Sequence, residues 1–234
     1  MPPCAVLIPA RNEGPRIGRV VASVRAVLPE SPVLVVDGHS EDHTADEAQA
    51  AGAEVLTQQG RGYASALFTG YQALQGRGHR RVLTLDADGQ HPPEAAPALV
   101  ARSIEGWDWV VASRQGTRSP TNLVNRLAHA ILAEAVRAAS GWRPGDPTSG
   151  FHLLQNDGLM RFPEWLRAGV ADANLRACAG RAGLRVCEVP VWMPGRTGGR
   201  SMHAGLQGWR NGVRSLRAVA EARRLVPVST PVMP

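Results

Sequence analysis

Two carboxylates and one amide follow a short apolar run. They belong to Asp86, Asp88 and Gln90, which come directly after residues 82–85. Hard oxygen ligands at this spacing suit a Mg²⁺ or Mn²⁺ ion that also holds substrate phosphates. Asp and Gly are also common turn residues, so a capped turn before the next helix is the alternative. Since solvated charge is less expected directly after an apolar strand, the pattern favours a metal site.

A third carboxylate, Asp37, ends the apolar run 33–36. Such an aspartate can contact the ribose or base of a nucleotide. It can also serve as a helix cap, since residues 40–44 lead into a helical pattern whose first turn is acidic. Ser40 or Thr44 could cap that helix while Asp37 binds a ligand, so both interpretations stay open.

Glycines and arginines supply two further candidate sites. Gly60 and Gly62 flank Arg61 before a helical pattern, where the backbone could approach a ligand and the guanidinium could clamp a phosphate. Further along the chain, Arg196 and Ser201 lie in a glycine-rich loop that could close over an anion. The alternatives are a plain turn for the first segment and a solvated basic loop for the second.

A compact polar turn, residues 146–152, runs into the apolar segment 151–154. It contains His152, and His91 follows the acidic pair described above. A plain β-turn would explain the segment equally well. A lone histidine is more often a structural hydrogen-bonding group than a ligand or a base.

These side chains need a scaffold, and the alternation of patterns predicts an α/β fold with a mostly parallel sheet. Short apolar runs at 5–8, 33–36, 82–85 and 109–112 alternate with helical patterns at 15–28, 44–51, 63–74 and 93–103. The carboxyl ends of such strands share one edge, where ligands bind. We therefore expect the polar clusters to converge at that edge. The alternation is less regular after Gly116, and we expect the second half to elaborate the same sheet within a single domain.

An amphipathic helix is predicted near the end of the chain, where apolar residues recur from 206 to 220 with arginines along one flank. Such a helix could lie at a membrane surface. Packing against the sheet of the same domain is the alternative and the more frequent arrangement.

Charge is unevenly distributed along the 234 residues, which carry a net charge of +6. Residues 1–117 contribute −3 and residues 118–234 contribute +9, and every basic residue is an arginine. The contrast suggests a site where a metal meets an anionic substrate, or a basic surface that lies on phosphates or anionic lipid. The absence of lysine excludes Schiff-base chemistry and a phosphate-loop lysine.

Several other classes are disfavoured. No basic and aromatic platform or nucleic-acid motif occurs, so we expect no nucleic-acid partner. No glycine fingerprint for a dinucleotide follows the first apolar run. Three widely spaced cysteines suggest neither a disulfide framework nor a zinc site, and no stretch reaches the roughly 18–20 apolar residues that span a bilayer. We expect a cytoplasmic protein, soluble or peripheral at the inner face of a membrane.

Six motifs in order, spread over residues 5–201, resemble the family 2 glycosyltransferases, with polyprenyl (dolichyl) phosphate sugar transferases as the most similar relatives. The motifs are Ile8-Pro-Ala-Arg-Asn-Glu13, Val35-Val-Asp-Gly-His-Ser-Glu-Asp-His-Thr44, Gly60-Arg-Gly62, Leu85-Asp-Ala-Asp-Gly-Gln-His-Pro92, Asp146-Pro-Thr-Ser-Gly-Phe151 and Arg196-x-x-Gly-x-Ser201. The resemblance implies a GT-A (Rossmann-like) fold over residues 1–201, followed by a basic helix and tail at 202–234. It also implies inverting transfer from a UDP- or GDP-linked sugar with Mg²⁺ or Mn²⁺.

The resemblance also assigns roles to residues, position by position. Donor contacts are implied for Pro9, Ala10, Arg11, Glu13, Asp37, Gly38, Gly62, Asp86, Ala87 and Asp88. Metal ligation is implied for Asp86, Asp88 and Gln90, and phosphate contacts for Arg114 and Arg126. Acceptor-side positions are Thr148, Ser149, Gly150, His152, Arg196 and Ser201, and Asp172 is the candidate base if one is needed. Relatives frequently carry a second aspartate at Gly38, so the preferred nucleotide base stays open. They also often carry an arginine at His152 and a lysine at Met202, and these departures leave open a protein that binds a nucleotide sugar without turnover.

The type of acceptor follows from the balance of charges. A hydroxyl nucleophile must lose a proton and needs a carboxylate base, whereas a lipid monophosphate arrives as an anion and needs arginines. The arginine-rich second half favours a polyprenyl phosphate. The alternatives are a soluble transferase that uses Asp172 as base on a hydroxyl acceptor, and a protein that binds a nucleotide sugar without turnover. A nucleotidyltransferase would want a glycine-rich basic loop after the first strand, where this chain supplies only Arg11.

Overall fold

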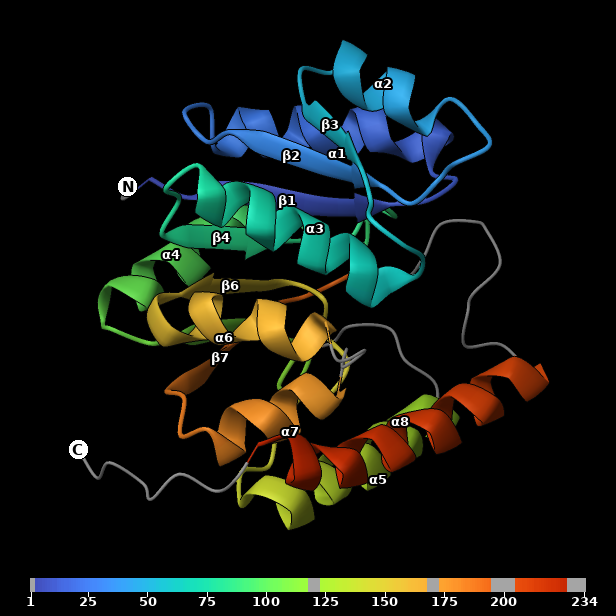
Figure 1. Ribbon diagram of the computed structural model, residues 1–234, viewed down its shortest axis with the longest axis vertical. Coiled ribbons are helices and arrows are strands. Elements are labelled where there is room, and N and C mark those ends of the chain that lie inside the picture. Colours follow the sequence, from blue (N-terminus) through green and yellow to red (C-terminus); the bar gives the residue numbers. More distant parts are fainter. Residues whose placement is uncertain (1–2, 118–122, 168–172, 195–204, 227–234) are drawn as a thin grey trace.

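The computed structural model describes residues 3–117, 123–167, 173–194 and 205–226. Their centre is a seven-stranded sheet with the order β3-β2-β1-β4-β6-β5-β7 (Figure 1). Within the described residues β6 runs antiparallel to its two neighbours, and the other pairs are parallel. The strands are β1 (Ala5–Ala10), β2 (Val33–Asp37), β3 (Glu54–Thr57), β4 (Arg81–Thr84), β5 (Trp109–Ser113), β6 (His152–Gln155) and β7 (Val186–Pro190).

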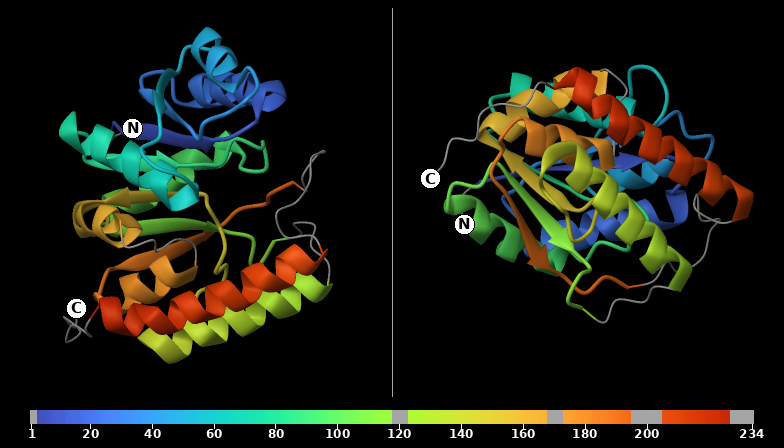
Figure 2. Two further views of the ribbon diagram at one scale, coloured as in Figure 1. Left: turned by 45° about the vertical axis from the view of Figure 1, so that its right-hand side comes forward. Right: turned by 90° about the horizontal axis from the view of Figure 1, so that it is seen from below.

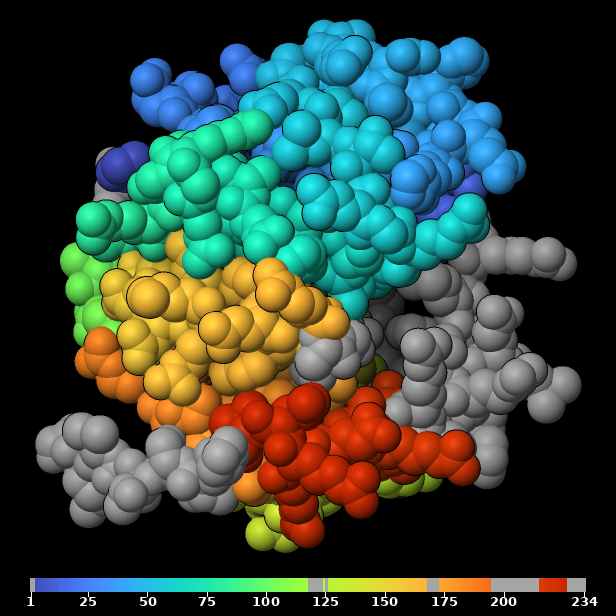
Figure 3. Space-filling model, in the orientation of Figure 1, coloured from blue at the N-terminus to red at the C-terminus, as the bar shows by residue number. Residues whose placement is uncertain are grey.

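Helices cover both faces of this sheet, and each face has its own core cluster. One face carries α1 (Gly14–Val27), α2 (Thr44–Ala50) and α4 (Ala96–Ile104), which follows the 3₁₀ turn Pro93–Ala95. The other carries α3 (Tyr63–Gly76), α5 (Leu123–Ser140), α6 (Asn156–Arg167), α7 (Ala173–Arg181) and α8 (Gly205–Leu225). On that second face α3, α6 and α8 follow one another down the surface shown in Figure 3.

Strand β1 shows why the sheet is buried on both sides. Leu7 belongs to one core cluster and its neighbours Val6 and Ile8 to the other, as the two-residue period of a strand requires. All six residues of β1 are buried. A strand covered on both faces needs an uninterrupted apolar run, which is what the sequence provides at this position.

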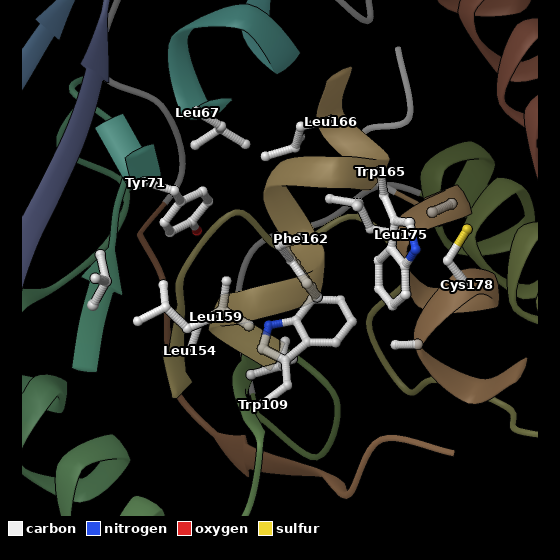
Figure 4. Packing of buried hydrophobic residues seen from close by; sticks show 14 of the residues in the cluster. Leu67, Tyr71, Trp109, Leu154, Leu159, Phe162, Trp165, Leu166, Leu175 and Cys178 are labelled. Atoms are coloured by element: carbon white, nitrogen blue, oxygen red, sulfur yellow. The ribbon is translucent and has the colours of Figure 1, made fainter. Parts of the chain in front are cut away.

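The core on the α6 face is built around Trp109 of β5 (Figure 4). Its ring meets that of Phe162 edge-to-face, with centroids 4.8 Å apart, and Phe162 lies 5.5 Å from Trp165. Such aromatic pairs add to the free energy gained by burying the rings. They attach α6, which follows Gly116, to β5, which precedes it, so the second half of the chain continues the core of the first.

The predicted alternation is confirmed in the first half, where the eight expected segments match observed elements apart from small shifts at their ends. Strand β3 was not predicted, because Glu54–Thr57 is an edge segment whose residues are exposed or half-buried and has no apolar run. The expectation that the second half elaborates the sheet is also confirmed, since β6 and β7 join it.

Helix α8 packs on the domain against α5 and α7 rather than against the sheet, and Leu216 and Ala220 of the predicted apolar face are exposed. Val219 and Ala222 are buried in the cluster that includes α5 and α7. Arg181 of α7 donates to the carbonyls of Val226 and Ala139, and Arg223 donates to that of Ala138. Among the described helices, none combines the length and the apolar character that crossing a bilayer requires.

Candidate active site

The predicted polar clusters meet at one edge of the sheet, marked in Figure 1 by the arrowhead of β1. Residues at the carboxyl ends of β1, β2, β4 and β5 reach this edge, and so does the turn that enters the antiparallel strand β6. Convergence therefore follows from the strand directions. The contacts described below divide the edge into three connected parts.

The first part joins the loops that follow β1 and β2. The backbone NH of Asn12 donates to Ser40 Oγ at 2.9 Å, and Asn12 Oδ1 accepts from the NH of Glu41 at 2.9 Å. Asp42 accepts from the NH groups of Gly14 and Thr44 at 3.0 and 3.1 Å. The two loops therefore form one unit.

Asp37 lies beneath this unit and is only 8% exposed. Its Oδ2 accepts from the NH of Ser40 at 3.1 Å, while its Oδ1 is buried without a hydrogen-bond partner among the described residues. A buried carboxylate oxygen is costly unless something donates to it, so the arrangement suits a ligand hydroxyl or amine. At Gly38, a Cβ would lie 3.1 Å from Arg11 Cβ and 3.2 Å from the carbonyl of Ala10, so the close passage of the two loops favours glycine here.

The other residues of this region that were predicted to contact the nucleotide-sugar donor differ in their exposure and in their ion pairs. Pro9 and Ala10 are buried at the end of β1, and Arg11 is exposed. Glu13 accepts from Arg16 Nη1 at 2.8 Å, so its carboxylate takes part in an ion pair at the start of α1. The structure brings these residues to the edge, but Glu13 is engaged within the protein.

The second part of the site surrounds Asp86. Gly62, with a φ of +92°, precedes α3, and the hydroxyl of Tyr63, the first residue of the helix, donates to Asp86 Oδ1 at 3.3 Å. On the other side, His91 Nδ1 accepts from the backbone NH of Asp86 at 2.9 Å while its ring stacks on Phe151. These contacts fix the turn after β4 from two directions.

Asp88 and Gln90 complete this turn. The backbone NH of Gln90 donates to Asp88 Oδ1 at 3.0 Å, and Gln90 Nε2 donates to the carbonyl of Pro194 at 3.3 Å. The side chain of Ala87 is buried in the core, so only its backbone can face a ligand. Through Gln90 the acidic turn is tied to the segment that precedes residues 195–204.

Gly150 lies directly against Asp86. A Cβ on Gly150 would lie 3.0 and 3.1 Å from the two carboxylate oxygens and 3.1 Å from the Tyr63 hydroxyl. The missing side chain thus leaves space beside the carboxylate. The prediction placed Gly150 with the acceptor, whereas the structure places it beside the predicted metal ligand.

The donor set of this turn fits a hard divalent cation. Two partly exposed carboxylates and one amide oxygen are ligands of the type that Mg²⁺ and Mn²⁺ accept, and Gly150 keeps the space beside Asp86 open. Within the described part of the chain, no group of three or more His, Cys, Asp or Glu side chains is arranged for a metal. A cation at this turn would therefore need further ligands from a bound diphosphate or from water.

The third part is an ion pair beneath the acceptor-side turn. Arg114 holds the buried Asp146 with two hydrogen bonds, Nε to Oδ2 at 2.7 Å and Nη2 to Oδ1 at 2.9 Å. Nη2 also donates to Thr148 Oγ1 at 3.1 Å, and that hydroxyl lies 3.2 Å from His129 Nε2. In this structure the Arg114 guanidinium positions residues 146–148, and its predicted contact with a substrate phosphate stays a prediction.

The pKa values of this pair follow from the geometry. Burial would raise the pKa of Asp146, but the hydrogen bonds and charge of Arg114 hold it well below its usual range. Burial would likewise lower the pKa of Arg114, but the Asp146 hydrogen bonds outweigh it and raise that pKa. The pair is therefore ionised at neutral pH.

His152 and Ser149 face the interior rather than the edge. The His152 ring is buried, accepts or donates a hydrogen bond with the Tyr71 hydroxyl at 2.8 Å, and has a pKa lowered to about 3 by burial and by the charge of Arg176. Ser149 Oγ accepts from the NH of Phe151, and its carbonyl accepts from Arg176 Nη2 at 2.8 Å. The geometry thus gives no support to an acceptor contact from the His152 ring, because the side chain of the first residue of β6 points into the core.

Arg126 is exposed on α5. The predicted residues Asp172, Arg196 and Ser201 lie outside the described part of the chain. Residues that the sequence analysis did not assign include Tyr63, Asp146, His129 and Glu188, whose Oε1 accepts from the NH of Gly145 at 2.8 Å. Tyr63 had a local signal, since it begins a helix directly after a Gly-Arg-Gly segment, but its reach to Asp86 depends on the sheet order.

The family comparison matches most of the chain. A protein-family model described as Glycosyl transferase family 2 matches residues 5–161. This range contains the loops after β1, β2 and β4 and the turn before β6.

The names of three curated relatives contain a lipid phosphate, which is the class of acceptor predicted from the sequence. A dolichyl-phosphate hexose transferase of Haloferax volcanii is 28% identical over 80% of this chain and 81% of its own length. An undecaprenyl-phosphate 4-deoxy-4-formamido-L-arabinose transferase of Shewanella sediminis is 29% identical over 53% of this chain but 41% of its own length. A dolichol-phosphate mannosyltransferase of Mycosarcoma maydis is 27% identical over 64% of this chain and 55% of its own. The chain thus spans about half the length of two of these relatives.

Solved structures share the fold. A glucosyl-3-phosphoglycerate synthase from Mycobacterium tuberculosis, in complex with Mn²⁺, UDP and its product, has a TM-score of 0.65 at 23% identity over 97% of this chain and 81% of its own. A mannosyl-3-phosphoglycerate synthase from Rubrobacter xylanophilus has a TM-score of 0.68 at 19% identity over 99% of this chain and 78% of its own. The expected GT-A fold is confirmed by this likeness.

Proposed function

Because the chain belongs to glycosyl transferase family 2, we propose that it transfers a sugar from a nucleotide-sugar donor to a polyprenyl phosphate, with inversion at the anomeric carbon. The observation that carries the proposal is the acidic turn after β4, where Asp86 and Asp88 lie at the ligand-binding edge and Gly150 leaves space against the first carboxylate. The names of the curated relatives support the acceptor class.

The donor nucleotide is proposed to occupy the unit formed by the loops after β1 and β2. Asp37 Oδ1 is the buried acceptor that a ribose hydroxyl or a base NH group would satisfy. Solved structures of the same fold hold UDP or UDP-glucose with Mn²⁺. These likenesses support a nucleotide sugar and leave the choice between UDP and GDP to experiment.

Asp86, Asp88 and the amide oxygen of Gln90 would hold the divalent cation. When bound, such a cation supplies positive charge that stabilises a departing nucleoside diphosphate. Tyr63 and His91 keep the Asp86 carboxylate in place, and Gln90 connects the turn to Pro194. The chain's own contribution is thus to preorganise the carboxylates before the donor arrives.

The transfer step requires no proton removal from a phosphate acceptor. An acceptor phosphate oxygen forms a bond to the anomeric carbon from the face opposite the leaving group. The bond from that carbon to the diphosphate oxygen breaks, and its electron pair stays on the nucleoside diphosphate. Since the acceptor is already an anion, arginines that position it replace the base that a hydroxyl acceptor would need.

The direct test is a transfer assay with labelled UDP-glucose and GDP-mannose, Mn²⁺ and a short-chain polyprenyl phosphate. We expect label in the organic phase, loss of that product in Asp88→Asn, and retention of it in Asp172→Asn. Labelling of a sugar or of 3-phosphoglycerate instead, abolished by Asp172→Asn, would contradict the phosphate acceptor and favour a hydroxyl acceptor with Asp172 as base.

A further inference from the structure

Arg176 on α7 is a charged residue in the interior, beside the acceptor-side turn (residues 146–150). It is 1% exposed, and Leu175 and Cys178 of the same helix pack in the core that contains Trp109 (Figure 4). An arginine is almost never fully buried unless its charge is paired, because taking a charge out of water is costly. Replacing a buried charge by an apolar side chain is often neutral or stabilising, so packing alone does not explain an arginine here.

Three interactions compensate the buried charge of Arg176. Nη2 donates to the carbonyl of Ser149 at 2.8 Å, a bond that the charge of the donor strengthens. The guanidinium carbon lies 5.2 Å from the centroid of the Trp109 ring, within the range of a cation–π contact. Asp146 supplies the opposite charge: burial would raise the pKa of this carboxyl, but the bonds and charge of Arg114 and then the charge of Arg176 lower it. Two of the three interactions therefore involve the turn itself.

Ser149 is a central position in this turn. Its predecessor Thr148 accepts from Arg114 Nη2 at 3.1 Å, and its successor Gly150 leaves the space beside the acidic turn after β4. Because a peptide unit is planar, a bond to the Ser149 carbonyl also fixes the orientation of the NH of Gly150. Arg176 thus holds from the interior the same turn that Arg114 holds from the end of β5.

Arg176 also balances the charges that contact this turn. Among the described residues, the carboxylates of Asp146 and Glu188 accept hydrogen bonds from the backbone of the turn or of Gly145 before it. The guanidiniums of Arg114 and Arg176 supply two positive charges in return. A neutral side chain at position 176 would leave these four positions with a net negative charge, which repels a phosphate.

We propose that Arg176 is a positioning residue for the acceptor: it holds the Ser149 carbonyl and keeps the acceptor-side turn from becoming net negative, so that an anionic phosphate can bind there. Because Arg176 is buried, it acts through the turn rather than by touching the substrate. The inference rests on the proposed function, since a hydroxyl acceptor would gain little from this charge.

Binding of a short prenyl monophosphate, geranyl phosphate, tests this role. Isothermal titration compares the wild type, Arg176→Met and Arg176→Lys below their melting temperatures, without nucleotide and again with Mn²⁺ and UDP or GDP, so that no transfer occurs. Methionine keeps an unbranched side chain that can lie on an aromatic ring, but it removes the charge and the hydrogen bond. We expect Arg176→Met to weaken binding about tenfold or more and Arg176→Lys about threefold or less, because lysine keeps a charged donor.

The matched control is Arg181→Met, which makes the same change on the same helix. The Arg181 guanidinium donates to the carbonyls of Val226 and Ala139, which lie outside the turn. Arg181→Met should bind geranyl phosphate as the wild type does. Mn²⁺-dependent donor binding should be unchanged in all three variants, which shows that the donor side of each one is folded.

The outcomes separate the role of Arg176 from the proposed function. Wild-type affinity in Arg176→Met, or equal weakening in Arg181→Met, would overturn the role of Arg176 and leave a polyprenyl phosphate acceptor intact. Binding by Arg176→Lys as weak as that by Arg176→Met would overturn the role of its charge. A wild type that binds the donor but no geranyl phosphate would contradict the proposed acceptor, and the role of Arg176 with it.

Discussion

Asp86 is surrounded by residues from two distant segments of the chain and from its own turn. Tyr63 from the start of α3, His91 from the following turn and Gly150 from the entry to β6 all lie against it or its backbone. An exposed carboxylate would sample several rotamers, whereas these neighbours restrict it. Restricting a metal-coordinating side chain before the metal binds lowers the conformational entropy that is lost on binding.

Gly150→Ala tests this arrangement. The added Cβ would lie about 3.0 Å from the Asp86 carboxylate, so the carboxylate must shift by a few tenths of an ångström. We expect Mn²⁺-dependent donor binding to weaken by roughly tenfold, about 1.4 kcal/mol, with little change in melting temperature. Isothermal titration measures the first quantity and calorimetry the second.

Gly76→Ala is the matched control, because a Cβ at Gly76 meets no atom within 4 Å. It should leave donor binding unchanged. If Gly150→Ala bound the donor as tightly as Gly76→Ala does, the space beside Asp86 would not matter for the metal site.

The Arg114–Asp146 pair makes stability depend on pH in a defined direction. The folded-state pKa of Asp146 is depressed, so its stabilising contribution is complete above the ordinary aspartate value of about 3.9 and is lost as pH falls toward the folded-state value. We expect Asp146→Asn to lower the free energy of unfolding at pH 7 by about 2–3 kcal/mol, less than the roughly 3–5 kcal/mol of a fully buried pair because Arg114 is 35% exposed. Urea denaturation of both proteins at pH 7, 5 and 3 should show a constant difference from pH 7 to 5 and a smaller one at pH 3. A difference that already disappears at pH 5 would contradict the depressed pKa.

At the scale of single residues, the sequence indicated which types could do chemistry but not their partners. Asp86, Asp88 and Asp37 follow apolar runs, and that local pattern was sufficient to place them at the edge. The Arg114–Asp146 bond joins residues 32 positions apart, so no local pattern predicts it. The burial of the His152 side chain was likewise not predictable, because it depends on the register of β6 against β4 and β5.

At the scale of elements, the contact between α3 and β1 determines where Tyr63 can reach. Gly70 lies on the side of α3 that faces Leu7, and a Cβ there would come within 2.2 Å of Leu7 Cδ1. Because Gly70 has no side chain, α3 can approach β1 closely at this point. The first half of the fold was predictable because each element carries its own period of apolar residues, whereas α5, α6 and α7 depend on contacts made after the sheet forms.

Gly70→Ala should therefore destabilise the protein by about 1–3 kcal/mol, since the core around Leu7 has no exposed surface into which it could expand. Chemical denaturation gives the free energy of unfolding. Gly76→Ala, at the last residue of the same helix, again serves as the comparison, and equal stability of the two variants would contradict the close approach.

At the scale of the whole molecule, the acidic turns and the most basic helix lie apart. The acidic turns after β2 and β4 lie at the ligand-binding edge of the sheet, and α8, with five arginines and one glutamate, lies beside α5 at the far end of the molecule (Figure 2). The charge of the second half was readable from the sequence, but the exposure of Val124, Leu127 and Ile131 along one side of α5 was not. An apolar stripe on a helix normally indicates a side that faces the core, and only the packing of α5 shows that its buried side is another one.

The most direct test of the account is isothermal titration of UDP-glucose, UDP-N-acetylglucosamine and GDP-mannose into the wild type and into Asp88→Asn, with and without Mn²⁺. The account predicts that one donor binds the wild type only when Mn²⁺ is present and that Asp88→Asn loses this binding while remaining folded. Equal binding without metal, or undiminished metal-dependent binding by Asp88→Asn, would contradict the assignment of the metal and donor diphosphate to the turn after β4.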